Sequence, residues 1–113
     1  MATRAVAVDR KRGRRERVIQ WTGLAVGDDG VWIEAAGWCI AWFIVSGTFG
    51  TATMNIEYDM SDDGSSTNIL LSTTAASRQQ QTHDNFLAGR IRPRITSGDG
   101  TTALAITVVL KAI

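Results

Sequence analysis

Two residues of this sequence could serve as a nucleophile or a general base, and each type occurs once. His83 and Cys39 are the only histidine and the only cysteine. A hydrolase triad would need His83, but this residue lies beside Asp84, and the chain has no Gly-x-Ser-x-Gly, His-Glu-x-x-His or P-loop pattern. Glu34 and Glu57 could act as paired carboxylates, although no spacing rule connects them. We therefore expect a protein without enzymatic activity.

Three acidic segments of the chain end in glycine: Asp28–Gly30, Asp62–Gly64 and Asp99–Gly100. Clustered carboxylates and loop carbonyls are the groups that calcium ions bind. None of the segments follows the twelve-residue alternating loop of an EF-hand, and Asp-Gly is also a strong signal for a hairpin turn. Cys39 alone can form neither an intrachain disulfide nor a cysteine-based metal site. We expect turns at these positions and no metal or cofactor.

Four tryptophans lie within 22 residues of one another: Trp21, Trp32, Trp38 and Trp42. Such rings could stack on sugars or on nucleic-acid bases. Each of them also neighbours apolar residues in a segment that is predicted to be a strand, which favours packing in the core or between subunits. We place Trp38 and Trp42 at a predicted subunit interface, with glycan stacking as the alternative.

Charge is divided unevenly along the chain. The formal net charge is +1, but residues 1–18 hold seven cationic and two acidic residues, whereas the remainder holds five and nine. Because residues 1–17 have few apolar side chains to bury, we predict an extended basic arm on an acidic domain of residues 18–113. The arm could bind phosphates, lie along an acidic protein surface through arginine–carboxylate pairs, or stay solvated. The predicted docking residues are Arg4, Arg10, Lys11, Arg12, Arg14, Arg15 and Arg17.

The rest of the chain alternates between apolar and polar residues, as antiparallel strands do. Between Thr51 and Met60 the even positions are apolar and the odd positions are polar, which predicts a strand with one buried face. Strands are also predicted at 18–22, 31–35, 38–45, 68–72, 90–95 and 102–112. Seven strands with turns at intervals of about ten residues predict an all-β fold, an antiparallel β-sandwich or jelly-roll-like barrel.

Three of these strands carry more specific expectations. Residues 38–45 are apolar on both faces, which predicts a central strand. Pro93 cannot donate a ladder hydrogen bond, so the strand at 90–95 is expected at a sheet edge or a bulge. In the strand at 102–112, small residues opposite the core would suit contact with a neighbouring chain. Three arginines of the strand at 90–95 share one face, either as a charged edge or as a subunit interface. They are Arg90, Arg92 and Arg94.

Two further segments bear on partners and on location. Residues 73–88 have no sustained periodicity, and a loop of this length is uncommon without a function, so we expect it to need a partner. The longest apolar run, Cys39–Val45, has seven residues, and a membrane helix needs about 20. No secretory signal follows Met1. We expect a soluble chain that is made in the cytoplasm.

Part of the sequence resembles small structural proteins of tailed bacteriophage virions. A Val-x-Gly-Thr-Phe-Gly strand at Val45–Gly50 leads to a Ser-x-Asp-Gly hairpin at Ser61–Gly64, and an Ile-Arg-x-x-Ile-Thr strand follows at Ile91–Thr96. The resemblance spans residues 43–104, about half of the chain. Members of this group are β-sandwiches that serve as capsid decoration (cement) proteins, as head fibres, or as parts of the neck and tail.

The resemblance and the charge pattern together predict a capsid decoration protein. The resemblance implies that the major capsid protein is the partner, that the protein lies on the surface of the virion head, and that it assembles in the host cytoplasm. The arm would dock on the capsid lattice, and we expect a dimer or trimer. A neck, tail or head-fibre component and a glycan-binding β-sandwich are the alternatives. The arm has no aromatic residues, which argues against nucleic-acid recognition.

Overall fold

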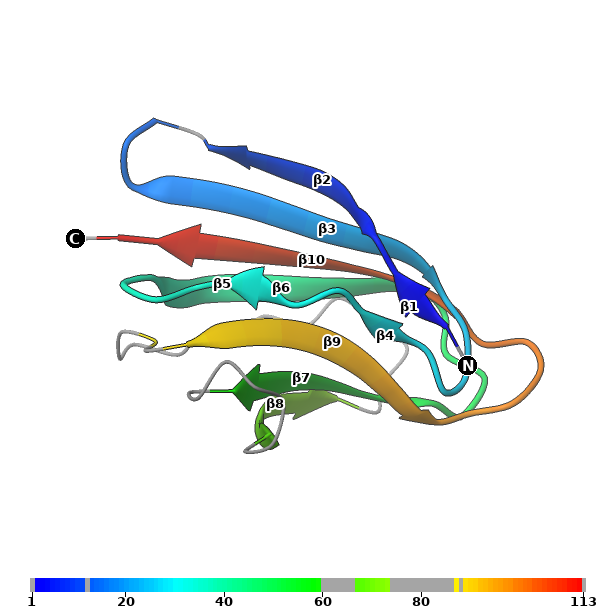
Figure 1. The fold of residues 1–113 in the computed structure, drawn as a ribbon. Helices are drawn as coiled ribbons and strands as arrows, with labels where there is room; N and C mark the ends of the chain where they lie inside the picture. The colour runs from blue at the N-terminus through cyan, green and yellow to red at the C-terminus, as the bar shows by residue number, and fades with distance from the viewer. Residues whose placement is uncertain (1, 12, 60–66, 74–86, 88, 113) are drawn as a thin grey trace.

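The computed structural model describes residues 2–11, 13–59, 67–73, 87 and 89–112 (Figure 1), without the side chains of residues 42, 67, 68, 70, 71 and 73. Its strands are β1 (Thr3–Arg4), β2 (Val6–Lys11), β3 (Glu16–Leu24), β4 (Asp29–Gly30), β5 (Ile33–Glu34), β6 (Cys39–Thr48), β7 (Thr53–Asp59), β8 (Thr67–Thr73), β9 (Arg90–Ser97) and β10 (Ala103–Lys111). All regular structure within these residues is β, which confirms the predicted all-β class.

The strands form two sheets that pack face to face. Sheet A has the order β1-β4-β9-β7-β8, and β5 also pairs with β9. Sheet B has the order β2-β3-β10-β6. In Figure 1, β2, β3 and β10 of sheet B lie above β9, β7 and β8 of sheet A, and the two chain ends lie at opposite ends of the molecule. The arrangement is a β-sandwich.

Alternate residues of the strands build one core between the two sheets. In β10, Leu104, Ile106, Val108 and Leu110 are each at most 1% exposed, as the alternation of a strand with one covered face requires. Burying one such side chain contributes roughly 1.5–3 kcal/mol relative to leaving it in water. The facing strands supply further core residues, among them Ile19, Trp21, Phe43, Val45, Met54, Ile56, Ile91 and Ile95.

All seven predicted strands are present, and three more bring the number within the described residues to ten. Two of the additional strands, β1 and β2, lie within residues 1–17, which we expected to form an extended arm. β2 pairs with β3 from Val6↔Trp21 to Lys11↔Arg17, and β1 pairs with β4 in parallel. The seven-strand count was too low because an edge strand needs backbone hydrogen bonds and few apolar side chains. In β2, Val6 packs against the core.

Two strands lie elsewhere in their sheets than expected, although β9 does have a register shift near its end, between Thr53↔Ser97 and Met54↔Ile95, as the bulge alternative allowed. β9 lies inside sheet A, because it pairs with β7 on one side and with β4 and β5 on the other. The ladder that β9 forms with β4 and β5 is interrupted between Asp29↔Arg94 and Ile33↔Ile91. Pro93 lies in this interruption, so no ladder hydrogen bond requires the N–H that proline lacks. β6 is the last strand of sheet B in the described part rather than a central strand, since only β10 pairs with it.

Gly30 allows β4 to pack directly on the indole ring of Trp21. The indole Nε1 donates a hydrogen bond to the carbonyl oxygen of Val31 at 3.2 Å. A Cβ atom on Gly30 would lie 2.6 Å from Cδ1 of Trp21 and 2.7 Å from Cδ of Pro93. Both distances are shorter than van der Waals contact, so a larger residue would force β4 away from the ring.

We predict that Gly30→Ala lowers the free energy of unfolding by about 1–3 kcal/mol, because the added methyl group overpacks this contact. Urea or thermal unfolding measures the change. Gly100→Ala is the matched control, since a Cβ there meets nothing within 4 Å. Equal stability of the two variants would contradict the packing argument.

Candidate functional site

Catalytic and metal-binding groups do not cluster in the described part of the chain. No set of three histidine, cysteine, aspartate or glutamate residues there could hold a metal ion. Cys39 is buried, and His83 lies outside the described residues. The same part of the chain contains no helix long and apolar enough to cross a membrane.

The three acidic glycine segments have different structures. Asp99 begins a turn, as expected, and its carboxylate accepts hydrogen bonds from the amide and the hydroxyl of Thr101. These bonds lower the pKa of Asp99. Asp28–Gly30 is not a turn, because its last two residues form β4. Asp62–Gly64 lies outside the described residues.

The carboxylate of Asp28 anchors the N-terminal segment. It accepts hydrogen bonds from the amides of Ala2 at 2.8 Å and Ala25 at 3.0 Å, and from Nε of Arg4 at 3.0 Å. Burial raises the pKa of Asp28, but the amide and guanidinium donors together outweigh burial and lower the pKa below its ordinary value. Arg4, the first of the predicted docking cations, is therefore paired within the chain.

Arg17 closes one end of the sandwich. Its Nε and Nη2 donate to the two carboxylate oxygens of Asp9 at 2.9 and 3.0 Å, and its Nη1 donates to the carbonyl oxygen of Glu34 at 3.0 Å. The hydrogen bond from Arg17 lowers the pKa of Asp9. Arg17 thus connects β2 and β3 of sheet B to β5 of sheet A, so a second predicted docking cation is also used within the chain.

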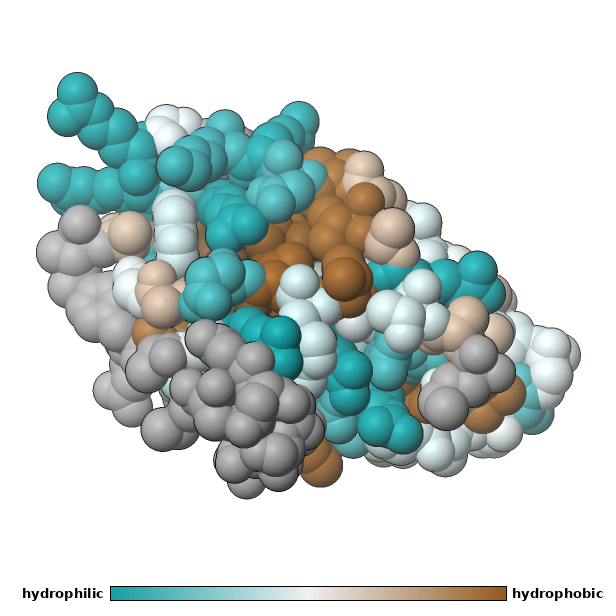
Figure 2. Space-filling view, in the orientation of Figure 1, coloured by the Kyte–Doolittle hydropathy of each residue, from teal (hydrophilic) through white to brown (hydrophobic). Residues whose placement is uncertain are grey.

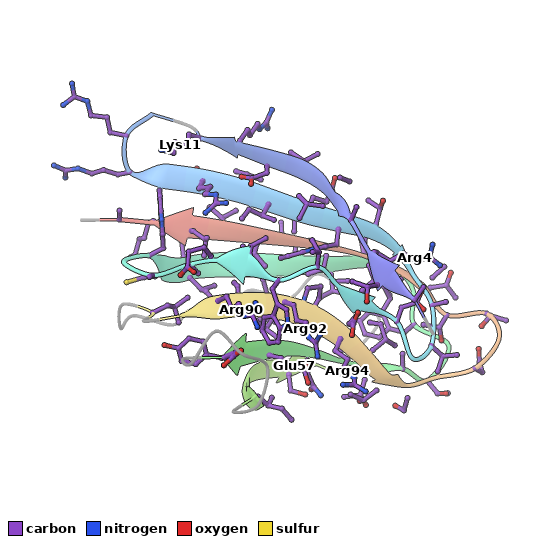
Figure 3. The ribbon with its side chains drawn as sticks, viewed as in Figure 1. Arg4, Lys11, Glu57, Arg90, Arg92 and Arg94 are labelled. Carbon is purple, nitrogen blue, oxygen red and sulfur yellow. The ribbon has the colours of Figure 1, made fainter. Side chains whose placement is uncertain are left out.

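Ion pairs link neighbouring strands on the outer face of sheet A (Figure 3). Nε of Arg92 lies 2.8 Å from Oε1 of Glu57, and its Nη1 lies 3.2 Å from Oδ2 of Asp29. Nη2 of Arg90 lies 3.1 Å from Oδ2 of Asp59, whose side chain is fully buried. These arginines, which we predicted at a subunit interface, bind carboxylates of their own chain.

Trp32 covers these ion pairs. Its ring centroid lies 4.3 Å from Cζ of Arg92 and 4.9 Å from Cζ of Arg90, distances at which a guanidinium is attracted to an aromatic ring. The sequence contained a signal for this cluster, because acidic residues on β7 and arginines on β9 both recur every second residue, as cross-strand partners do. Arg94 forms no ion pair with another described residue.

The other tryptophans have different surroundings. Trp21 is fully buried in the core. Trp38 is partly buried and packs against the core. Trp42 belongs to β6, and its side chain lies outside the described part. The three tryptophans whose rings are described therefore do not form one stacking platform, since Trp21 lies in the core and Trp32 lies over the arginines of sheet A.

The remaining described cations of residues 1–17 gather at the turn between β2 and β3. Arg10 and Lys11 end β2, and Arg14 and Arg15 precede β3. All four are exposed, and none has an ion pair with another residue in the described ranges. We call these four residues the cationic tip. Arg12, also a predicted docking residue, lies outside the described residues.

The cationic tip is held by the sheet beneath it. The turn contains Gly13, whose φ of 74° favours glycine. The amide of Ala112 donates to the carbonyl oxygen of Arg15 at 2.8 Å, which places the C-terminal end of β10 beside the turn. Figure 2 shows hydrophilic side chains projecting at this end of the molecule, where Figure 3 labels Lys11. The sandwich therefore presents concentrated positive charge on a structured hairpin.

Such a tip suits anionic partners. Arginine forks bind carboxylates and phosphates in pairs of hydrogen bonds, and each charge-assisted bond is stronger than a neutral one.

Comparisons with protein-family models, with curated proteins and with solved structures find no match to this chain.

We predict that the stability of the protein falls at acid pH as Asp28 becomes protonated. The folded pKa of Asp28 is below its ordinary value of 3.8, so its stabilising effect is complete above that pH and is lost as the pH falls through the folded pKa. Asp28→Asn is expected to cost about 1–2 kcal/mol at neutral pH and to flatten the fall in melting temperature below pH 3.8. Glu34→Gln, at an exposed carboxylate, is the control. An unchanged pH profile in Asp28→Asn would contradict this role.

We also predict that Arg92→Ala destabilises the fold by about 3 kcal/mol, because it leaves two largely buried carboxylates without their cation. Arg94→Ala changes the same residue type on the same strand and is expected to stay within about 0.5 kcal/mol of the parent protein. Chemical unfolding measures both variants. If the two variants have the same stability, the cluster does not hold sheet A together.

Proposed function

We propose that this protein is a structural subunit of a bacteriophage virion that docks on the head through its cationic tip, as a capsid decoration protein. The observation that carries the proposal is the group of four exposed cations on a structured hairpin at one end of a β-sandwich. The resemblance of residues 43–104 to phage structural proteins supports the same function.

Rigid presentation of the charges favours docking on a protein surface. Five register pairs join β2 to β3, and Arg17 holds both strands at the base of the tip. Binding therefore orders a few side chains rather than a whole arm, which lowers the entropic cost of association. The partner would offer carboxylates in a groove or along a ridge, with the major capsid protein as our candidate.

The alternative anion is the phosphate of a nucleic acid. Binding to duplex DNA would weaken with salt at a slope of about −0.9 per neutralised phosphate. The described part of the tip has no aromatic side chain to stack on a base, and Trp32 is engaged by two arginines. A partner that offers carboxylates fits this end of the protein better, and DNA binding becomes an outcome of the test.

We predict that Arg14→Glu lowers the binding of this protein to purified heads assembled without it by at least about 10-fold, because the substitution reverses a charge at the tip. Co-sedimentation with the heads measures occupancy over a range of salt concentrations. Arg94→Glu is the matched control, since it makes the same change on the outer face of sheet A and is expected to leave occupancy unchanged.

Two results would decide against this proposal. Full occupancy of the heads by Arg14→Glu would exclude docking through the tip. Loss of affinity for duplex DNA in Arg14→Glu, with no binding of the parent protein to heads, would assign the tip to nucleic acid. The copy number per virion then separates head decoration, with hundreds of copies, from a neck or tail part with about a dozen.

A further inference from the structure

The two outer faces of the sandwich differ in charge. Sheet A carries arginines and carboxylates on its outer face, and these are paired with one another. On sheet B, the ladder places Val109 opposite both Val18 and Trp42, and Thr107 opposite both Gln20 and Ile44. Cross-strand partners share a face, and these positions alternate with the buried core residues of the same strands. The centre of the outer face of sheet B is therefore uncharged.

Small and neutral residues continue along this face. Ala105 pairs with Ser46, and Ala103 pairs with Thr48. Gln20 donates a hydrogen bond to the hydroxyl of Thr107 at 3.1 Å, so the polar groups at the centre already have partners within the sheet. The chain has 20% charged residues, yet none of these central positions carries a charge.

We propose that the outer face of sheet B is the surface through which two copies of this chain associate, face to face. The proposal adds a homotypic interface to the proposed function and does not involve the cationic tip. Two uncharged faces can pack about 10 Å apart, as stacked sheets do, without bringing like charges together.

Charge at the rim selects the orientation of the two copies. The charged residues on this face lie at the end near the tip: Arg10 pairs with Val18, and Lys111 pairs with Glu16. In a parallel arrangement the tips of the two copies would lie together and repel each other. A two-fold axis with antiparallel strands places them at opposite ends, and such an isologous contact closes at a dimer.

The area of the outer face of sheet B sets the expected affinity of the dimer. Four strands about 4.8 Å apart and about eight residues long give a face of roughly 500 Å². Two faces would bury about 1,000 Å², near the lower limit for specific interfaces. Val18 and Val109 are only 8% and 5% exposed in the single chain, so the buried area comes mainly from the residues around them on this face. We expect a dimer with a dissociation constant on the order of micromolar.

Sedimentation equilibrium of the full chain tests this interface. We expect the parent protein to be a dimer at about 0.1 mM, a concentration above the expected dissociation constant. Ala105→Lys, next to the centre of this face, is expected to weaken dimerisation at least about 100-fold, because each copy then places an ammonium group in an uncharged contact. Ala103→Lys, at an exposed end of the same strand, provides a second variant if Ala105→Lys fails to fold. Ala36→Lys in an exposed turn is the matched control and should dimerise normally.

Three outcomes would overturn the interface: a monomeric parent protein at this concentration, normal dimerisation of both Ala105→Lys and Ala103→Lys, or equal weakening by Ala36→Lys. The dependence on salt concentration distinguishes dimerisation from the docking in the proposed function. Dimerisation through an uncharged face should not weaken with added salt, whereas docking through the cationic tip should. If the protein is monomeric and still binds heads, only the proposed dimer interface is overturned. If it dimerises and does not bind heads, only the proposed docking is overturned.

Discussion

The packing of Trp21 between the two sheets is the constraint on which the rest of the structure depends. This ring is fully buried, and its N–H must find an acceptor because an unpaired buried donor is costly. The carbonyl oxygen of Val31 provides it, and that carbonyl is available only if β4 lies directly on the ring. Gly30 makes this close approach possible. The position of β4 then determines where the adjacent carboxylates lie.

Those carboxylates connect the N-terminal segment to both sheets. Asp28 binds the backbone of Ala2 and the side chain of Arg4, and Asp29 accepts a hydrogen bond from the hydroxyl of Thr3 at 2.7 Å. Asp29 also pairs with Arg92 on the outer face of sheet A. Thus the buried ring, the anchor of β1 and the charged network of sheet A form one continuous set of contacts, and β2 follows from this anchor to the edge of sheet B.

Sequence alone predicted much of this fold and less of the site. Most of the seven predicted strands were found because one covered face imposes a period of two, as in β10. β1 and β4 were missed because two residues show no period, and β2 was missed because its charges outnumber its valines. The interior position of β9 could not be read from Pro93, since the gap between β4 and β5 that accepts a proline is a tertiary feature. The partners of the arginines also depend on which strands are adjacent.

The basic segment serves folding and surface charge at the same time, and its residues divide between these roles by position. Arg4 and Arg17 lie where acidic side chains of the body can reach them, so their charges stabilise the fold. Arg10 and Lys11 lie in the last ladder pairs of β2 with β3, Arg14 and Arg15 lie in the turn that follows, and all four are exposed to solvent. Because β2 leads into the tip and pairs with β3 up to Lys11↔Arg17, the tip cannot move away from the sandwich without loss of the edge strand β2. Any anionic partner would therefore meet these cations in a fixed arrangement, which would favour recognition of a shaped acidic surface over capture by a flexible tail.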